Sequence, residues 1–239
     1  MSGGYPPAQA GRSPARSEQS EQSNDLPRIE DIRNALAGYA PVLAKRGRER
    51  HASVALVLRQ GASTSAEILF IERAEKEGDP WSGHMAFPGG RVDLPGESPE
   101  QAAVRETLEE VGLELAGAER LGRLDDLEGN RAGRAVGMVI SAFVYHLPQP
   151  GELVKQDSEV REAFWVPVRH LIEPDRRVRR AFHGTGSFEF PGIVVGEPDR
   201  HVVWGLTYRF LEVFFRALGR PFPDAWGELA AVRDHIESA

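Results

Sequence analysis

The segment from residue 86 to residue 113 constrains the fold of this chain most, because it joins a glycine turn to a helix with clustered carboxylates. Local signals set the limits of that helix. Ser98 is a favourable N-cap residue, and Gln101 completes a capping box with it. Pro99 suits the first helical position, and Gly112 suits a left-handed residue that ends the helix. The sequence therefore predicts a helix over residues 99–111.

The predicted helix gathers its acids on one side. Helical spacing brings Glu106, Glu109 and Glu110 within about one turn of each other. The opposite stripe, which we expect to pack against the protein, is apolar and consists of Val104, Leu108 and Val111. On this interpretation the side chain of Glu110 is exposed. If it is a metal ligand, its replacement by Gln should then lower kcat by orders of magnitude and leave thermal unfolding nearly unchanged.

An acidic helix face is usually no more than a solvated surface. Three features favour a metal site here. Glu106 and Glu110 repel each other at i,i+4, the glycine turn precedes the helix at loop distance, and Arg105 can pair with Glu97 to brace that loop. Mg2+ prefers oxygen ligands and keeps some of its water, so two or three helix carboxylates with substrate phosphate oxygens form a plausible shell.

Composition excludes several other classes of protein. The net charge of -7 and a pI near 5.6 argue against binding to nucleic acid or to an anionic membrane, which usually requires a basic face. The chain has no cysteine, which excludes disulfides and thiolate sites and makes zinc improbable. An apolar leader and a long apolar run are both missing, so the expected location is the cytoplasm.

The remaining chain reads as a polar tail followed by one folded domain. Residues 1–25 are poor in large apolar groups and are expected to be disordered, and residues 26–239 form the domain. Apolar runs predict strands near residues 52–58, 68–71, 136–145 and 163–166. Helical periodicity predicts an amphipathic helix over residues 29–39 and a closing helix over residues 206–218, within a C-terminal helical extension of about 203–239.

The stretch from Glu97 to Leu113 resembles the Nudix box, G-x5-E-x7-R-E-U-x-E-E-x-G-U with U apolar. Two positions depart from it, since Gly90 lies one residue too far from Glu97 and Thr107 replaces an apolar residue. The resemblance implies an α/β fold, an α/β/α sandwich with a mixed sheet, with its catalytic loop-helix-loop at about residues 89–113. It also implies Mg2+- or Mn2+-dependent diphosphate hydrolysis. The implied metal ligands and catalytic residues are Glu106, Glu109 and Glu110, with Arg105 and Glu97 as supporting residues.

Residues outside the box resemble the coenzyme A diphosphatase branch of that family. They are Ile68–Ala74, the motif G-x3-F-P-G-G at residues 83–90, and Trp204-Gly205-Leu206-Thr207. The resemblance implies cleavage of coenzyme A or an acyl-CoA to 3',5'-ADP and 4'-phosphopantetheine or its acylated form. The implied substrate contacts are Arg73, Phe87, Gly89 and Gly90. The chain departs from the branch at Asp79, near which the branch usually has an arginine.

Several alternatives stay open on the sequence alone. ADP-ribose, NADH, dinucleoside polyphosphates and oxidised nucleotides share this type of catalytic helix, and a noncatalytic nucleotide-sensing module could keep the scaffold. The general base could be Glu106 or Glu109, or a later carboxylate, Glu159 or Glu162, for which a solvated surface position is the more common case. Aromatic residues that could stack on adenine are Trp81, Phe87 and Trp204.

Overall fold

The structure is a computed structural model, and it describes residues 27–45, 50–62, 65–78, 81–131, 134–182 and 189–223, without the side chains of residues 130, 131 and 134–136. The predicted N-terminal tail lies outside the described residues. The same holds for Asp79 and for residues 224–239 of the predicted C-terminal extension.

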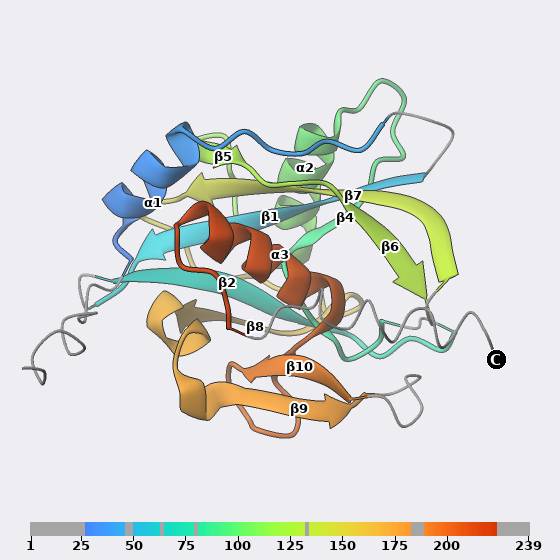
Figure 1. The fold of residues 1–239 in the computed structure, drawn as a ribbon. Helices are drawn as coiled ribbons and strands as arrows, with labels where there is room; N and C mark the ends of the chain where they lie inside the picture. Colours follow the sequence, from blue (N-terminus) through green and yellow to red (C-terminus); the bar gives the residue numbers. More distant parts are fainter. Residues whose placement is uncertain are drawn as a thin grey trace, which may run out of the picture.

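A mixed β-sheet forms the centre of the molecule (Figure 1). Strand β1 (Arg50–Gln60) pairs antiparallel with β2 (Ala66–Arg73) and parallel with β7 (Arg134–His146). The order continues from β2 to β3 (Met85–Ala86) and from β7 to β5 (Glu119–Arg123). Three further strands pair with this row: β4 (Gly89–Arg91) with β1, β6 (Leu127–Arg131) with β7, and β8 (Val160–Pro167) with β2. The predicted strands are thereby confirmed.

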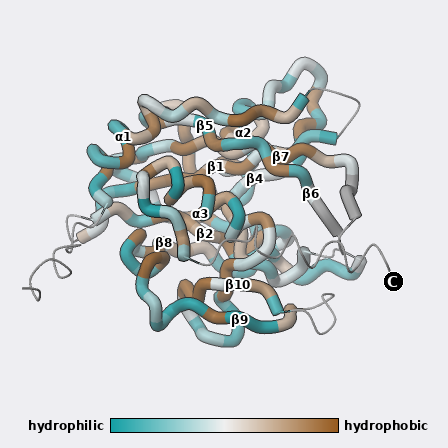
Figure 2. Tube along the Cα trace, viewed as in Figure 1, coloured by the Kyte–Doolittle hydropathy of each residue, from teal (hydrophilic) through white to brown (hydrophobic). Residues whose placement is uncertain are grey.

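Helices cover both faces of this sheet because its central strands are apolar on both sides. Leu56 and Leu58 of β1 join the core beneath α1 (Ile29–Ala37) and α3 (Gly205–Ala217). The alternate residues Ala55 and Val57 join the core beneath α2 (Pro99–Val111). Successive side chains of a strand point to opposite faces, so one strand serves both cores. The predicted α/β/α sandwich is confirmed, and the apolar segments of the central strands stand out in Figure 2.

A second, smaller sheet was not predicted from the sequence. It consists of β9 (Arg177–Ala181), β10 (Glu189–Val194) and β11 (Val202–Val203), each antiparallel to its neighbour. Two short 3-10 turns, Val168–Leu171 and Pro174–Arg176, connect it to β8. Strand β9 is rich in arginine and β10 contains Pro191 and Gly192, which are residue types depleted in strands. The strand propensities of these residues therefore do not predict this sheet.

None of the helices in the described ranges combines the length and the apolar character needed to cross a membrane.

Candidate active site

The boundaries of α2 agree with the predicted capping signals. The Ser98 hydroxyl accepts a hydrogen bond from the Gln101 backbone N–H at 3.2 Å, and the Gln101 side chain accepts one from the Ser98 N–H at 2.8 Å. At the other end Gly112 has a φ of 71°, the left-handed conformation that glycine adopts without strain. These contacts fix where the acidic residues of the helix begin and end.

The orientation of α2 differs from the prediction. The residues that α2 buries include Ala103, Thr107 and Glu110, whereas Leu108 is 50% exposed. Thr107 fits in this buried position because its hydroxyl donates a hydrogen bond to the Ala103 carbonyl oxygen at 2.7 Å. The expected apolar stripe is therefore wrong at Leu108, and Glu110 is buried rather than exposed.

The glycine turn explains how carboxylates fit into that contact. In β4, Gly89 lies opposite Val54 and Gly90 opposite Ser53 of β1. A Cβ atom on Gly89 would come within 2.2 Å of the Ser53 carbonyl oxygen, and one on Gly90 within 2.3 Å of the Glu106 carboxylate. The Gly89 N–H also donates to Glu110 Oε2 at 2.8 Å. Gly90 thus leaves room for the Glu106 carboxylate, whereas Gly89 lets β4 lie close to β1 while its N–H binds Glu110.

Three carboxylates converge beside this turn. Among the described residues, Glu106, Glu110 and Glu159 each offer an oxygen that lies within 4.8 Å of the others, and we call these the three-carboxylate site. Burial raises the pKa of Glu110 to about 8, although the Gly89 N–H and the charge of Arg73 oppose this. Burial also raises the pKa of Glu106, against the hydrogen bond from Arg105. Crowded oxygen donors of this kind fit a hard divalent cation such as Mg2+.

The third member of this site is Glu159, whereas the sequence had indicated Glu109. Glu109 is not part of the group; its side chain is 54% exposed and accepts a hydrogen bond from Arg105 Nη1 at 3.0 Å. Glu159, directly before β8, takes part instead. The sequence offered it only as one of several possible bases, since no local pattern relates it to a helix far earlier in the chain.

Arg105 holds the acids of the loop and the helix together. Its Nε and Nη2 atoms donate to the two oxygens of Glu97 at 2.8 and 3.2 Å, and its Nη1 atom donates to Glu106 at 2.9 Å. The Nη2 atom also donates to the Arg91 carbonyl oxygen at 3.1 Å. The hydrogen bonds from Arg105 lower the pKa of Glu97, so this carboxylate stays charged. The predicted pairing of Arg105 with Glu97 is confirmed.

We expect Arg105→Lys to lower kcat about 10-fold to 100-fold, because an ammonium group cannot reproduce the planar set of donors that orients Glu97 and Glu106. Steady-state kinetics at saturating Mg2+ would measure this. Arg33→Lys is a matched control, since Arg33 makes a similar two-bond pair with Glu119 (2.7 and 2.8 Å) on the exposed surface of α1. Equal kinetics of the two variants would contradict the bracing role of Arg105.

The structure corrects one expected substrate contact. Phe87 is 2% exposed and stacks on Phe70 with ring centroids 5.0 Å apart, so its ring presents almost no surface to a substrate. Trp204 is stacked on Phe182 at 4.1 Å, and Trp81 is half-buried. Arg73, at the end of β2, lies near enough to Glu110 for its charge to act on that carboxylate.

The structure therefore combines an α/β/α sandwich with a capped acidic helix that packs against a glycine turn. The family model described as the NUDIX domain matches residues 49–192. The chain belongs to the Nudix family, and its fold is the Nudix fold.

The chain is also similar to curated proteins and to a solved structure. An uncharacterized protein of Schizosaccharomyces pombe is 36% identical over 60% of this chain and 49% of its own length. The mitochondrial coenzyme A diphosphatase NUDT8 of Homo sapiens is 30% identical over 73% of this chain and 71% of its own length. The solved binary complex of an Ap4A hydrolase from C. elegans is 23% identical, covers 51% of this chain and 83% of that chain, and has a TM-score of 0.41. The chain thus spans about half the length of the first of these relatives.

Proposed function

We propose that this protein is a Mg2+- or Mn2+-dependent pyrophosphohydrolase that cleaves the diphosphate bond of a nucleoside diphosphate derivative. The single observation that carries the proposal is the convergence of Glu106, Glu110 and Glu159 beside the glycine turn. Membership of the Nudix family supports hydrolysis of such bonds.

The three-carboxylate site is suited to the metal for a physical reason. Two of its members carry raised pKa values because burial and neighbouring carboxylates penalise their charge, and a divalent cation would remove that penalty. Glu106, Glu110 and Glu159 would hold the ion. When bound, Mg2+ neutralises charge on the diphosphate and lowers the pKa of coordinated water.

The surrounding residues would orient these groups. Arg105, itself held by Glu97, fixes one oxygen of Glu106, and the Gly89 N–H fixes one oxygen of Glu110. Glu109 lies outside the three-carboxylate site but shares Arg105 Nη1 with Glu106, and we propose it as a further ligand or as the base. We propose that the attacking water gives its proton to Glu106, Glu109 or Glu159.

For the substrate we propose coenzyme A or an acyl-CoA, with 3',5'-ADP and 4'-phosphopantetheine or its acylated form as the products. The sequence motifs around Arg73 and Gly89-Gly90 and the similarity to the human coenzyme A diphosphatase support this choice. Arg73, Gly89 and Gly90 are the proposed substrate contacts. The expected cytoplasmic location and the expected lack of nucleic-acid and membrane partners stay predictions.

Product analysis by liquid chromatography and mass spectrometry would test this proposal. The full chain with Mg2+ is incubated in parallel with coenzyme A, ADP-ribose, NADH and diadenosine polyphosphates, and Glu106→Gln is the inactive control. We expect conversion of coenzyme A to 3',5'-ADP with the highest kcat/KM of the set. Preference for another compound would overturn the coenzyme A choice alone. No turnover of any of them would contradict the enzymatic function and favour a nucleotide-sensing module.

A further inference from the structure

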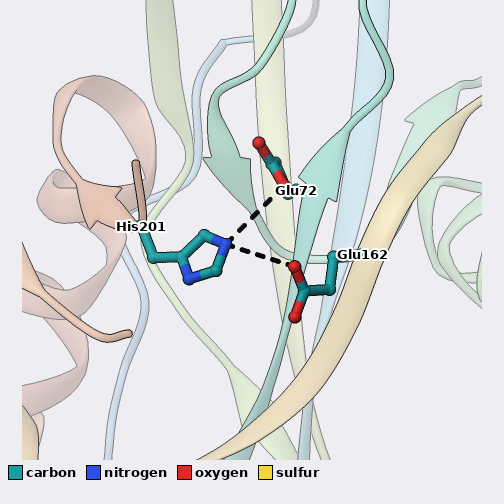
Figure 3. A group of neighbouring side chains, drawn as sticks. All are labelled: Glu72, Glu162 and His201. Carbon is teal, nitrogen blue, oxygen red and sulfur yellow. Dashed lines mark ion pairs between the residues drawn. The ribbon is translucent and has the colours of Figure 1, made fainter. Parts of the chain in front are cut away.

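A second cluster of charged side chains lies between β2, β8 and the turn that joins β10 to β11. Glu72 of β2 is 1% exposed and lies directly opposite Glu162 of β8. His201 points its Nε2 atom at both carboxylates, 3.4 Å from Glu162 and 3.7 Å from Glu72 (Figure 3). Arg200 donates from Nε to Glu72 at 3.0 Å and from Nη2 to Glu72 and to Glu162, the latter at 2.9 Å. We call these four residues the Glu72 cluster.

Two carboxylates and a histidine can bind a metal, but the hydrogen bonds of this cluster argue against that use. His201 Nδ1 accepts a hydrogen bond from the Glu197 N–H at 3.1 Å, so the ring proton of the neutral imidazole sits on Nε2. A metal on Nε2 would need that nitrogen free of its proton. In addition, Arg200 already occupies oxygens of both Glu72 and Glu162.

The Glu72 cluster instead holds the turn between β10 and β11 in a fixed position. A Cβ atom on Gly196 would lie 2.4 Å from His201 Nδ1, so the turn closes tightly around the ring only because that residue is glycine. The backbone N–H of His201 donates to the Glu197 carbonyl oxygen at 2.8 Å. The carbonyl oxygen of His201 accepts a hydrogen bond from the Val195 N–H at 2.9 Å. Arg200 and His201 lie beyond residue 192, where the match to the family model ends. They tie this last part of the chain to the central sheet.

The Glu72 cluster lies at an irregularity in the pairing of β2 with β8. Glu72 lies opposite Glu162, but the next residue, Arg73, lies opposite Val160, so Arg161 is an extra residue in β8. A bulge of this type bends its strand and redirects the neighbouring side chains. Arg161 Nη1 also lies 3.4 Å from Glu72 Oε1. The buried carboxylate of Glu72 therefore binds both the bulge residue Arg161 and Arg200.

Glu159 lies two residues before the bulge residue Arg161 in the chain. Its carbonyl oxygen accepts a hydrogen bond from the Ala74 N–H at 2.8 Å, two residues along the chain from Glu72. Its carboxylate completes the three-carboxylate site, although its side chain is 42% exposed and its ion-pair partner, Lys76 Nζ, is 3.5 Å away. The side chain has little support of its own, so its place depends on the backbone, which is bonded to Gln156 on one side and to Ala74 on the other.

We propose that Arg200 is a positioning residue for the metal site, acting through the Glu72 cluster and the β8 bulge on Glu159. This inference rests on the proposed function, in which Glu159 is a metal ligand. The C-terminal part of the chain, which contributes none of the three carboxylates, thereby governs how strongly the metal is bound.

Titration of the metal-free full chain with Mn2+, followed by electron paramagnetic resonance, would test the proposal without any substrate. We expect Arg200→Met to raise the Kd for Mn2+ about 10-fold, the usual scale for a residue that orients a ligand. Arg180→Met is the matched control, because Arg180 makes an exposed pair with Asp199 at 3.3 Å in the same part of the fold. Its Kd should equal that of the wild type. A wild-type Kd for Arg200→Met would overturn the proposal.

A double-mutant cycle with Glu159→Gln separates positioning from general destabilisation. If Arg200 acts through Glu159, Arg200→Met should add little to the Kd of Glu159→Gln. Additive effects would overturn the positioning role and leave the metal site intact. An unchanged Kd in Glu159→Gln alone would contradict the ligand role of Glu159 and with it both proposals. Should Arg200→Met not fold, Glu72→Gln/Arg200→Gln removes both charges together, and the same cycle applies to it.

Discussion

Glu110→Gln should lower kcat by about 100-fold or more and, in the metal-free protein, raise the thermal unfolding temperature at alkaline pH. The first effect follows from loss of a charged metal ligand, for which about 3 kcal/mol of transition-state stabilisation is a reasonable magnitude. The second follows from burial: Glu110 is 2% exposed, and its pKa is raised to about 8. The sequence alone had predicted an unchanged unfolding temperature.

The sign of the pH effect follows from proton linkage. Between the ordinary value of 4.5 and the raised value of about 8, the folded state holds a proton at Glu110 that the unfolded state releases. The wild type therefore loses stability as the pH rises through this window, by on the order of 5 kcal/mol in total. Glutamine has no charge to bury, and its side-chain oxygen can still accept from the Gly89 N–H. Below pH 4.5 the two proteins should be equally stable.

Thermal unfolding of both proteins from pH 4 to pH 9 with a chelator would measure this difference. Glu114→Gln, at an exposed position just beyond α2, is the control and should follow the wild type at every pH. Mg2+ should stabilise the wild type most above pH 8, where Glu110 is ionised, and should stabilise Glu110→Gln less. If the unfolding temperatures of the wild type and Glu110→Gln change with pH in the same way across the whole range, burial of this carboxylate does not lower the stability of the wild type.

Gly90→Ala and Gly89→Ala change adjacent residues but should have different effects: the first on metal binding and kcat, the second on stability. A methyl group on Gly90 would meet the Glu106 carboxylate at 2.3 Å, and a side chain can move aside. We expect this variant to fold, to bind Mn2+ more than 10-fold less tightly and to lose kcat by a similar factor, because Glu106 is displaced. A methyl group on Gly89 would meet the Ser53 carbonyl oxygen at 2.2 Å and the Val54 Cα atom at 2.6 Å, and neither can move without breaking the pairing with β1.

For Gly89→Ala we therefore expect a loss of about 3 kcal/mol in the free energy of unfolding. Denaturant unfolding and Mn2+ titration of both variants would separate the two outcomes. Gly117→Ala is the control, since no atom lies within 4 Å of the position that its Cβ would take. A Gly90→Ala protein with wild-type metal affinity would show that Glu106 can bind the ion from another position.

The local features of this protein could be predicted from short stretches of its sequence. Ser98, Gln101 and Gly112 act within one turn of helix, so the limits of α2 could be predicted from them. The apolar runs of β1 and β2 likewise predict their own strands and their pairing. The link between Arg105 and Glu97 was also predictable, because a short loop and a known helical register bring the two together. Each of these depends on neighbours in the chain.

Which carboxylates meet, and which side of α2 is buried, depends on packing between distant parts of the chain. Helical spacing puts Glu110 and Leu108 on different faces, but the face that packs is chosen by the glycine turn, which leaves room for carboxylates against β1. Glu159 lies directly before β8, which pairs with β2, and Arg200 reaches Glu72 from the turn between β10 and β11, strands that local propensity did not predict. Contacts between distant segments depend on how whole elements pack, and no short window of sequence contains that information.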